Sequence, residues 1–187
     1  MPGADGLVPL PEVEGVRHRY VYVDGVRFHV AEAGPADGPP VVLLHGWPQH
    51  WYAWRSIIPI LAAAGRHVVC PDLRGMGWSD APPGPYLKAT LADDMLGVLD
   101  ALELGRVDLI AHDWGAWIGF LLCLEYPDRF AHFVPLNIST PWLEPPSPDG
   151  AIVAARLWYQ VVLAAPGLGA ALLRRTKLVE RMITTGA

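Results

Sequence analysis

Short apolar runs alternate with segments of helical character along residues 1–140, and this alternation is the strongest constraint on the fold. PPVVLLHG, RHVVCPDL, RVDLIAHD and FAHFVPLNIS are apolar stretches of the kind expected for strands covered on both faces. Helix-like segments separate them, from about Trp51 to Ala64, from about Leu87 to Leu104, and along GAWIGFLLCLEY. Strands joined by such helices form right-handed crossovers. We therefore predict an α/β fold with a mostly parallel, doubly wound sheet.

Turn residues delimit these elements. RHRYVYVDGVRFHVAEAG is predicted to form a β-hairpin, because Asp24-Gly25 is a strong tight-turn signal between two β-rich runs. Gly65 is expected to end the first helix and Gly105 the second.

The pattern changes after Thr140. PWLEPPSPDG is a proline-rich connector, and two helix-like segments follow, from Ala151 to about Ala165 and from about Leu168 to Met182. No strand-like run follows them in this sequence. We therefore predict a boundary that separates residues 1–140 from residues 141–187.

Composition narrows the class of protein. With 52% hydrophobic and 18% charged residues and a net charge of −5, the chain is expected to fold and offers no basic cluster for nucleic acid. The N-terminus lacks the pattern of a signal peptide, and the longest apolar runs are too short or too broken to span a bilayer. Cys70 and Cys123 are expected to be free thiols inside apolar stretches. A cytoplasmic protein without membrane association is the expectation.

One strand-to-helix junction is a candidate active site. RVDLIAHD passes into GAWIGFLL through Ala111-His112-Asp113-Trp114-Gly115, the small-x-nucleophile-x-small pattern of a nucleophile elbow. Such a turn lifts its central residue above the sheet at a helix N-terminus, where negative charge is favoured. A carboxylate there can attack carbon and form an ester, which suits epoxides or alkyl halides. The alternative is that Asp113 only caps the helix.

Three segments carry a resemblance to a known family, namely HGWPQHWYAWR, DLRGMGWSD and HDWG, in this order. They are similar to the epoxide hydrolase and haloalkane dehalogenase branch of the α/β-hydrolases, over about Arg17 to the end of the chain. The resemblance implies that residues 1–140 are the N-terminal part of the core domain and residues 141–187 the start of a helical cap. It also implies an oxyanion hole formed by the backbone N–H groups of Trp47 and Trp114. The Trp47–Pro48 bond is a candidate cis peptide.

Two positions distinguish the activities within this branch. Haloalkane dehalogenases commonly carry Asn after His-Gly, where its side chain binds the departing halide, and this chain has Trp47. Epoxide hydrolases supply an acid as cap tyrosines, and Tyr159-Gln160 before Pro166-Gly167 resembles their first cap helix. A phenol can protonate the epoxide oxygen, although Tyr159 could instead be a packing residue. We predict an epoxide hydrolase, with haloalkane dehalogenase as the alternative, acting on a small apolar epoxide or alkyl halide and water without cofactor or metal.

Other conspicuous residues are expected to be structural. His45 should brace the His-Gly turn by a hydrogen bond, and Asp72 and Arg74 belong to a loop that is structural in the family. His112 should point away from Asp113, and His50 should be a structural histidine. Some tryptophans could line the pocket or fill the core: Trp78, Trp117 and Trp142.

The catalytic partners of Asp113 are not found in the sequence. In this fold the order is nucleophile, acid, base, so a histidine is required after Asp113. The only later histidine is His132, at the start of a strand and so at the opposite end of the sheet, and Asn137 stands where some dehalogenases carry the acid. The last strands are absent, and FAHFVPLNIS should form an uncovered edge. The residues encode either part of an epoxide hydrolase, inactive as this truncated chain, or a non-catalytic remnant.

Overall fold

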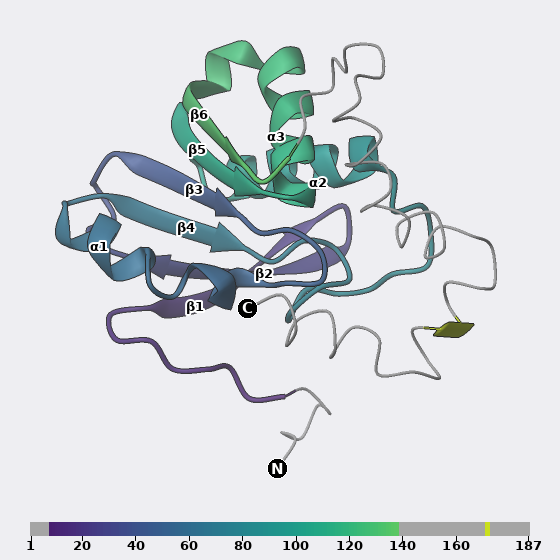
Figure 1. Cartoon of the computed structure of the whole chain (residues 1–187), viewed down its shortest axis with the longest axis horizontal. Helices are drawn as coiled ribbons and strands as arrows, with labels where there is room; N and C mark the ends of the chain where they lie inside the picture. Colours follow the sequence, from purple (N-terminus) through teal and green to yellow (C-terminus); the bar gives the residue numbers. More distant parts are fainter. Residues whose placement is uncertain (1–7, 139–170, 173–187) are drawn as a thin grey trace, which may run out of the picture. The chain divides into compact units, whose positions relative to one another are not determined.

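The computed structural model describes residues 8–138 and 171–172 of the chain. The chain divides into two units, Met1–Ser139 and Thr140–Ala187, and the second falls almost wholly outside the described residues. The first unit is built on a six-stranded sheet (Figure 1). The helix-like segments predicted within residues 151–182 lie outside the described residues except for residues 171–172, which are helical.

The sheet is mostly parallel, as the sequence predicted. Its order is β1-β2-β4-β3-β5-β6; β1 pairs antiparallel with β2 and β2 with β4, whereas β3 pairs parallel with β4 and β5, and β5 with β6. The strands are β1 Arg17–Val23, β2 Val26–Ala33, β3 Pro40–Leu44, β4 His67–Pro71, β5 Val107–His112 and β6 Phe130–Leu136.

The predicted hairpin is present and pairs Val23 with Val26. Asp24 and Gly25, the two residues of its turn, have φ values of 48° and 79°. Two successive left-handed residues match the twist of the flanking strands, which is why Asp-Gly favours this connection.

Helices cover both faces of the sheet. They are η1 Trp51–Trp54, α1 Ile58–Ala63, α2 Lys88–Ala101, α3 Trp114–Glu125 and η2 Pro127–Arg129. Because successive strand residues point to opposite faces, Val42 and Leu44 of β3 pack in the core formed with α2 and α3. Val41 and Leu43 pack in a second core with η1 and α1. The doubly wound architecture follows from this two-sided burial.

Two predicted helix boundaries were wrong. The single helix expected over residues 51–64 is divided into η1 and α1, and Pro59 near the start of α1 has no N–H to continue a helix from the preceding turn. The helix expected to close at Gly105 ends at Ala101, with Glu103 in the left-handed region at φ 55°.

Within the described residues, β6 forms the uncovered edge that the sequence predicted. β6 lies at the end of the strand order, and Val134 and Leu136 are exposed hydrophobic side chains on it. Both cysteines are free; Cys70 is buried and Cys123 is half-buried, and burial raises the pKa of the Cys123 thiol to about 11. Among the described residues, no helix has the length and apolar character needed to cross a bilayer.

Candidate active site at the carboxyl edge of the sheet

The strand order places the candidate site at a point where the chain reverses direction across the sheet. From β3 the chain passes to β4 on one side, and later returns to β5 on the other. β3 and β5 are parallel neighbours with Leu44 opposite Ala111. Their carboxyl ends therefore lie side by side, at the position where open α/β sheets bind ligands.

The β5–α3 junction has the geometry of a nucleophile elbow. Asp113 has φ 52° and ψ −118°, a backbone conformation that non-glycine residues rarely adopt. A Cβ at Gly115 would lie 2.5 Å from the carbonyl oxygen of His45 and 2.6 Å from that of Leu44, so only glycine fits there. The small residue required by the predicted pattern is thus explained by close packing of α3 against the end of β3.

The carboxylate of Asp113 is held from outside its own helix. Although Asp113 occupies the N-cap position of α3, its side chain makes no capping hydrogen bond. Its Oδ1 instead accepts a hydrogen bond of 2.9 Å from the backbone N–H of Trp47. The alternative that Asp113 only caps the helix is therefore wrong.

The His-Gly turn after β3 brings this N–H to the carboxylate. The Trp47–Pro48 peptide is cis, as predicted. A Cβ on Gly46 would lie 2.4 Å from Cβ of Asp113, so the turn can approach the carboxylate only with glycine at this position. His45 braces the turn as predicted: Nε2 accepts from the N–H of Leu73 at 3.0 Å, and Nδ1 lies 3.0 Å from the carbonyl oxygen of Gly46.

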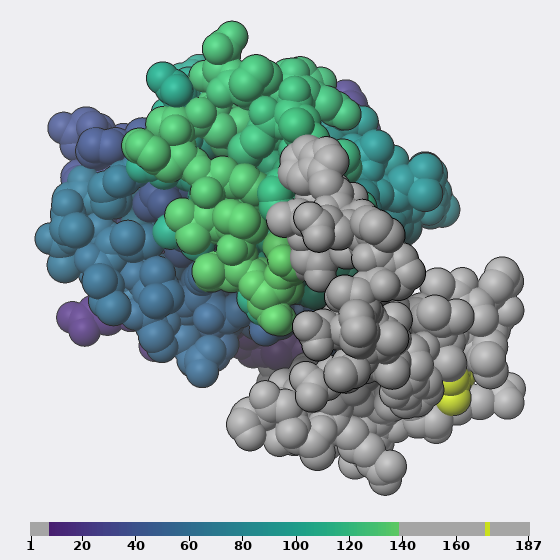
Figure 2. All heavy atoms as spheres, turned by 45° about the horizontal axis from the view of Figure 1, so that its top comes forward, coloured from purple at the N-terminus to yellow at the C-terminus, as the bar shows by residue number. Residues whose placement is uncertain are grey.

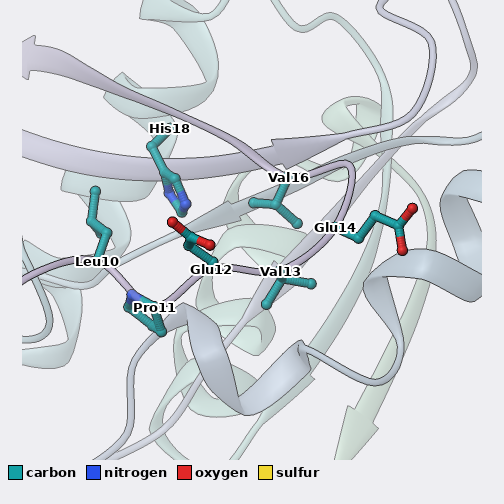
Figure 3. Close-up of a pocket in the computed structure, with 7 residues that line it drawn as sticks. All are labelled: Leu10, Pro11, Glu12, Val13, Glu14, Val16 and His18. Carbon is teal, nitrogen blue, oxygen red and sulfur yellow. The ribbon is translucent and has the colours of Figure 1, made fainter.

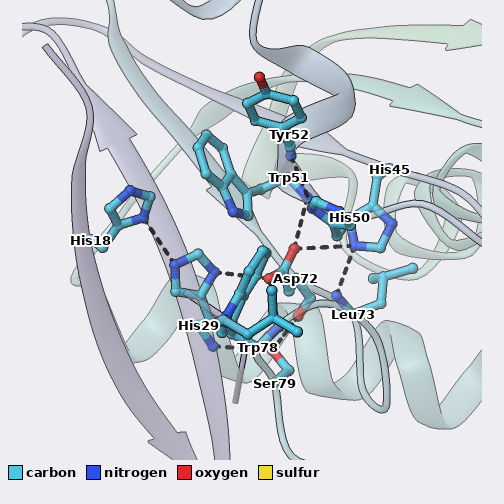
Figure 4. A network of polar contacts seen from close by, with 11 residues as sticks. His18, His29, His45, His50, Trp51, Tyr52, Asp72, Leu73, Trp78 and Ser79 are labelled. Carbon is cyan, nitrogen blue, oxygen red and sulfur yellow. Dashed lines mark hydrogen bonds and ion pairs between the residues drawn. The ribbon is translucent and has the colours of Figure 1, made fainter. Parts of the chain in front are cut away.

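Asp72 is the centre of a buried polar network behind this turn (Figure 4). Its carboxylate accepts from Nδ1 of His29 at 2.8 Å and from the backbone N–H groups of Trp51 at 2.7 Å and Trp78 at 3.0 Å. His18 extends the network, with Nδ1 3.0 Å from Nε2 of His29. The network joins β1, β2, the loop after β4 and the start of η1, so the predicted structural role of Asp72 is confirmed.

Burial sets the charge state of this network. It would raise the pKa of the Asp72 carboxyl, but the hydrogen bond from His29 and the charge of His45 outweigh burial and hold that pKa below its usual range. Burial lowers the pKa of His18, His45 and His50, against the attraction of Asp72. The N–H donors around Asp72 therefore favour its ionised form, whereas burial disfavours the charged form of His18, His45 and His50.

Aromatic rings and one cation lie beside Asp113. The indole centroids of Trp47 and Trp114 are 6.3 Å apart, and Nζ of Lys88 lies 2.9 Å from the centroid of the Trp114 ring. Burial lowers the pKa of Lys88 to about 8, although the charge of Asp113 acts in the opposite direction. Lys88 was not among the residues predicted from the sequence; its only signal is a lysine at the first position of a helix, where cations are disfavoured.

Four other residues that the sequence pointed to can be compared with the structure, namely His132, His50, Arg74 and Trp78. His132 lies near the start of β6 with Nδ1 2.7 Å from Oδ1 of Asp108, at the edge opposite Asp113 as expected. His50 acts as the N-cap of η1, and Arg74 pairs with Asp94. Trp78 is buried, and its indole N–H donates to the carbonyl of Val8 at 2.6 Å, so it is structural. Predicted residues outside the described part of the chain are Tyr159 and Trp142.

A hollow elsewhere on the molecule is unrelated to this chemistry. It has a volume of about 700 Å³ and is lined by the N-terminal segment from Leu10 to Val16 and by His18 (Figure 3). Asp113, Trp47 and Trp114 do not line it. The residues that the structure describes contain no group of three or more His, Cys, Asp or Glu side chains able to hold a metal ion.

Comparisons with known proteins agree with the fold. The model of the alpha/beta hydrolase fold matches residues 39–175. Epoxide hydrolase 2 of Siraitia grosvenorii is 40% identical over 128 residues, which are 67% of this chain and 40% of that protein. A haloalkane dehalogenase of Psychrobacter cryohalolentis is 44% identical over 118 residues, or 62% of this chain and 39% of that protein.

Solved structures show the same relationship. An epoxide hydrolase from Vigna radiata superposes with a TM-score of 0.78 at 37% identity, covering 94% of this chain and 58% of that one. Epoxide hydrolase A from Mycobacterium thermoresistibile gives a TM-score of 0.72 at 36% identity, covering 84% and 51%. The chain thus spans about 40% of the length of the curated relatives named above. On the family match and these similarities, the chain belongs to the alpha/beta hydrolase fold family, among relatives that include epoxide hydrolases and haloalkane dehalogenases.

Proposed function

We propose that this chain carries the nucleophile half of an epoxide hydrolase that acts through a covalent ester on Asp113. The observation that carries the proposal is the elbow itself: a carboxylate at φ 52°, free of its own helix and bonded by the N–H of Trp47. A carboxylate held in this way is available to attack a carbon placed above the carboxyl edge of the sheet.

The contacts of the carboxylate assign roles to its two oxygens. Oδ1 accepts from Trp47, so we assign Oδ2 as the atom that attacks the ring carbon. The new bond joins Oδ2 to carbon while the carbon–oxygen bond of the epoxide breaks, and its electron pair stays on the oxygen. We assign the proton for that oxygen to Tyr159, which lies outside the described residues.

Backbone N–H groups next to Asp113 also suit the second step, the hydrolysis of the ester. When water attacks the ester carbonyl, negative charge develops on Oδ1, which already accepts from Trp47. Trp114 is the first residue of α3, and the first N–H groups of a helix have no carbonyl partner inside it. We therefore assign the N–H groups of Trp47 and Trp114 to the oxyanion hole. In this proposal residues 1–140 belong to the core domain and residues 141–187 begin the cap.

A haloalkane dehalogenase is the second candidate. The relative from Psychrobacter cryohalolentis supports it, as do the paired indoles of Trp47 and Trp114 next to the nucleophile. Trp47 lacks the side-chain amide that commonly binds halide in such enzymes, and this favours the epoxide reaction.

Within these 187 residues, the step that releases product has no candidate base. His132 is the only histidine after Asp113 in the sequence, and it contacts Asp108 at the opposite edge of the sheet. We propose that this chain by itself does not turn over, whether as part of an enzyme or as a non-catalytic remnant. The coding sequence downstream of Ala187 separates the two: a reading frame that adds Asp and His on later strands supports the enzyme, and a stop supports the remnant.

The reaction is tested on the longest product that contains these residues. Styrene oxide with diol detection and a halide-release assay are run in parallel, on the wild type and on Asp113→Asn. We expect diol formation and its loss in the variant, because an amide is a poor nucleophile. Turnover that survives in Asp113→Asn removes Asp113 from the mechanism, and halide release without diol formation reverses the choice of reaction.

A further inference from the structure

The ammonium group of Lys88 is an unassigned cation beside the candidate nucleophile. Its Nζ lies 2.9 Å from the centroid of the Trp114 ring, and Trp114 directly follows Asp113 in the chain. A cation on the face of an indole is stabilised by the ring, but the ring accepts none of the three N–H bonds in the ordinary sense. The N–H groups of Lys88 can therefore still donate hydrogen bonds to a ligand near the nucleophile.

Lys88 has no carboxylate partner among the described residues. No carboxylate oxygen in residues 8–138 or 171–172 lies within 4.0 Å of its Nζ, whereas Arg74, Arg66 and Arg129 all have such partners. The side chain is half-buried, and burial lowers its pKa to about 8 in spite of the charge on Asp113. A partly desolvated ammonium that no carboxylate of the described residues neutralises is a candidate site for an anion.

The position of Lys88 at the start of a helix strengthens the attraction of this site for an anion. Lys88 is the first residue of α2, whose first turn contains no acidic residue and whose N-cap, Leu87, makes no side-chain hydrogen bond. A cation there is opposed by the helix dipole, which costs stability. The same arrangement adds unpartnered backbone N–H groups to the ammonium, and both attract negative charge.

We propose that Lys88 is an anion-binding residue that selects substrates with a carboxylate close to the reacting carbon, such as an epoxide of the glycidate type. The proposal rests on the proposed function, because it places the substrate between Asp113 and Lys88. It distinguishes this site from one that takes only apolar substrates: the carboxylate would lie beside the Lys88 ammonium and the reacting carbon next to Asp113.

Binding measurements test the proposal without requiring turnover. The sequence contains two lysines, Lys88 and Lys177, so reductive ¹³C-methylation gives two assignable lysine signals, with Lys177 as an internal reference. The probes are phenylacetate and its uncharged analogue phenylacetamide. We expect phenylacetate to shift the Lys88 signal and to raise its pKa by about one unit, as a nearby opposite charge does. We expect phenylacetamide to leave the pKa of Lys88 unchanged.

Two variants provide the comparison. In Lys88→Met the preference for phenylacetate over phenylacetamide should fall at least tenfold. Arg106→Met is the matched control: it removes one positive charge from an exposed residue that precedes β5, at the end of the strand opposite Asp113, and it should keep the preference within twofold. A loss of preference in both variants would show only a net-charge effect and would overturn the proposal.

Further outcomes separate this proposal from the proposed function. A carboxylate outside the described residues could already pair with Lys88. The pKa of Lys88 without ligand would then lie at or above the ordinary lysine value, and that result overturns the anion-binding role. In Asp113→Asn, which cannot form an ester, phenylacetate should bind at least as tightly as in the wild type because a nearby negative charge is gone. Weaker binding there contradicts the geometry proposed for Lys88, whereas epoxide turnover that survives in Asp113→Asn of the longest product, with intact phenylacetate binding, contradicts only the proposed function.

Discussion

Replacement of Asp72 by asparagine is the most informative test of how the site is supported. Asp72 is fully buried and its carboxylate accepts three N–H bonds, from His29, Trp51 and Trp78. Asparagine has nearly the same shape but presents an NH₂ group in place of one oxygen. The variant therefore probes hydrogen bonding and charge, with little change in packing.

The expected loss of stability follows from the geometry. Trp51 bonds to Oδ1, whereas His29 and Trp78 bond to Oδ2. In either orientation of the amide, at least one backbone N–H faces the NH₂ group and is left without an acceptor, which costs about 1–3 kcal/mol. The remaining bonds lose their charge assistance, about 1 kcal/mol in total, and the lower cost of burying a neutral group offsets part of this. We expect a net loss of about 1.5–3.5 kcal/mol, a large fraction of the ~5–15 kcal/mol typical of a domain.

Urea denaturation at pH 7, followed by tryptophan fluorescence, measures this loss. Asp80→Asn is the matched control from the same loop, because Asp80 accepts one backbone N–H from Arg27 at 3.2 Å and forms a partly exposed ion pair with the same residue. Such a pair contributes about 1 kcal/mol or less. A loss below about 1 kcal/mol for Asp72→Asn, or equal losses in the two variants, would refute the role given to the network.

Three further predictions follow from the same contacts. Gly46→Ala places a methyl group 2.4 Å from Cβ of Asp113, so the Trp47–Asp113 hydrogen bond should break. In the longest protein product that contains these residues, we expect epoxide turnover to fall at least tenfold. Unchanged turnover contradicts the close approach of Gly46 to Asp113. Burial lowers the pKa of His18 and His45 in the folded protein below the unfolded value of about 6.5. Their contribution to stability is therefore complete above about pH 6.5 and is lost as the pH falls through their folded-state pKa values. Urea midpoints that do not decrease between pH 7 and pH 5 contradict this. The 187-residue chain incubated with styrene oxide should form no diol, because it lacks a histidine base near Asp113 to hydrolyse the ester. It should also show no mass shift, because the alkylation needs the acid assigned to Tyr159, which only a complete cap would position. Steady diol release, detected by chromatography beside intact-mass spectrometry, overturns the statement about the base.

Local sequence was sufficient to predict the structure wherever a single short stretch of chain determines it. The Asp24-Gly25 turn, the apolar strands and the elbow around Asp113 were all predictable, because turn chemistry and side-chain periodicity act over a few residues. The same reasoning failed at Pro59 and at Glu103, where the ends of helices depend on competing local signals that differ little in free energy.

The contacts that define the candidate site could not be obtained in this way, because they join residues far apart in the chain. Trp47 reaches Asp113 only because β3 and β5 are neighbours in the sheet, and Asp72 reaches His29 because β4 pairs with β2. The position of Lys88 over Trp114 depends likewise on how α2 and α3 pack. The sequence alone determined which residues could act at this edge of the sheet, and the packing of strands and helices decided which of them meet, since the free energy of each contact exists only when distant segments are brought together.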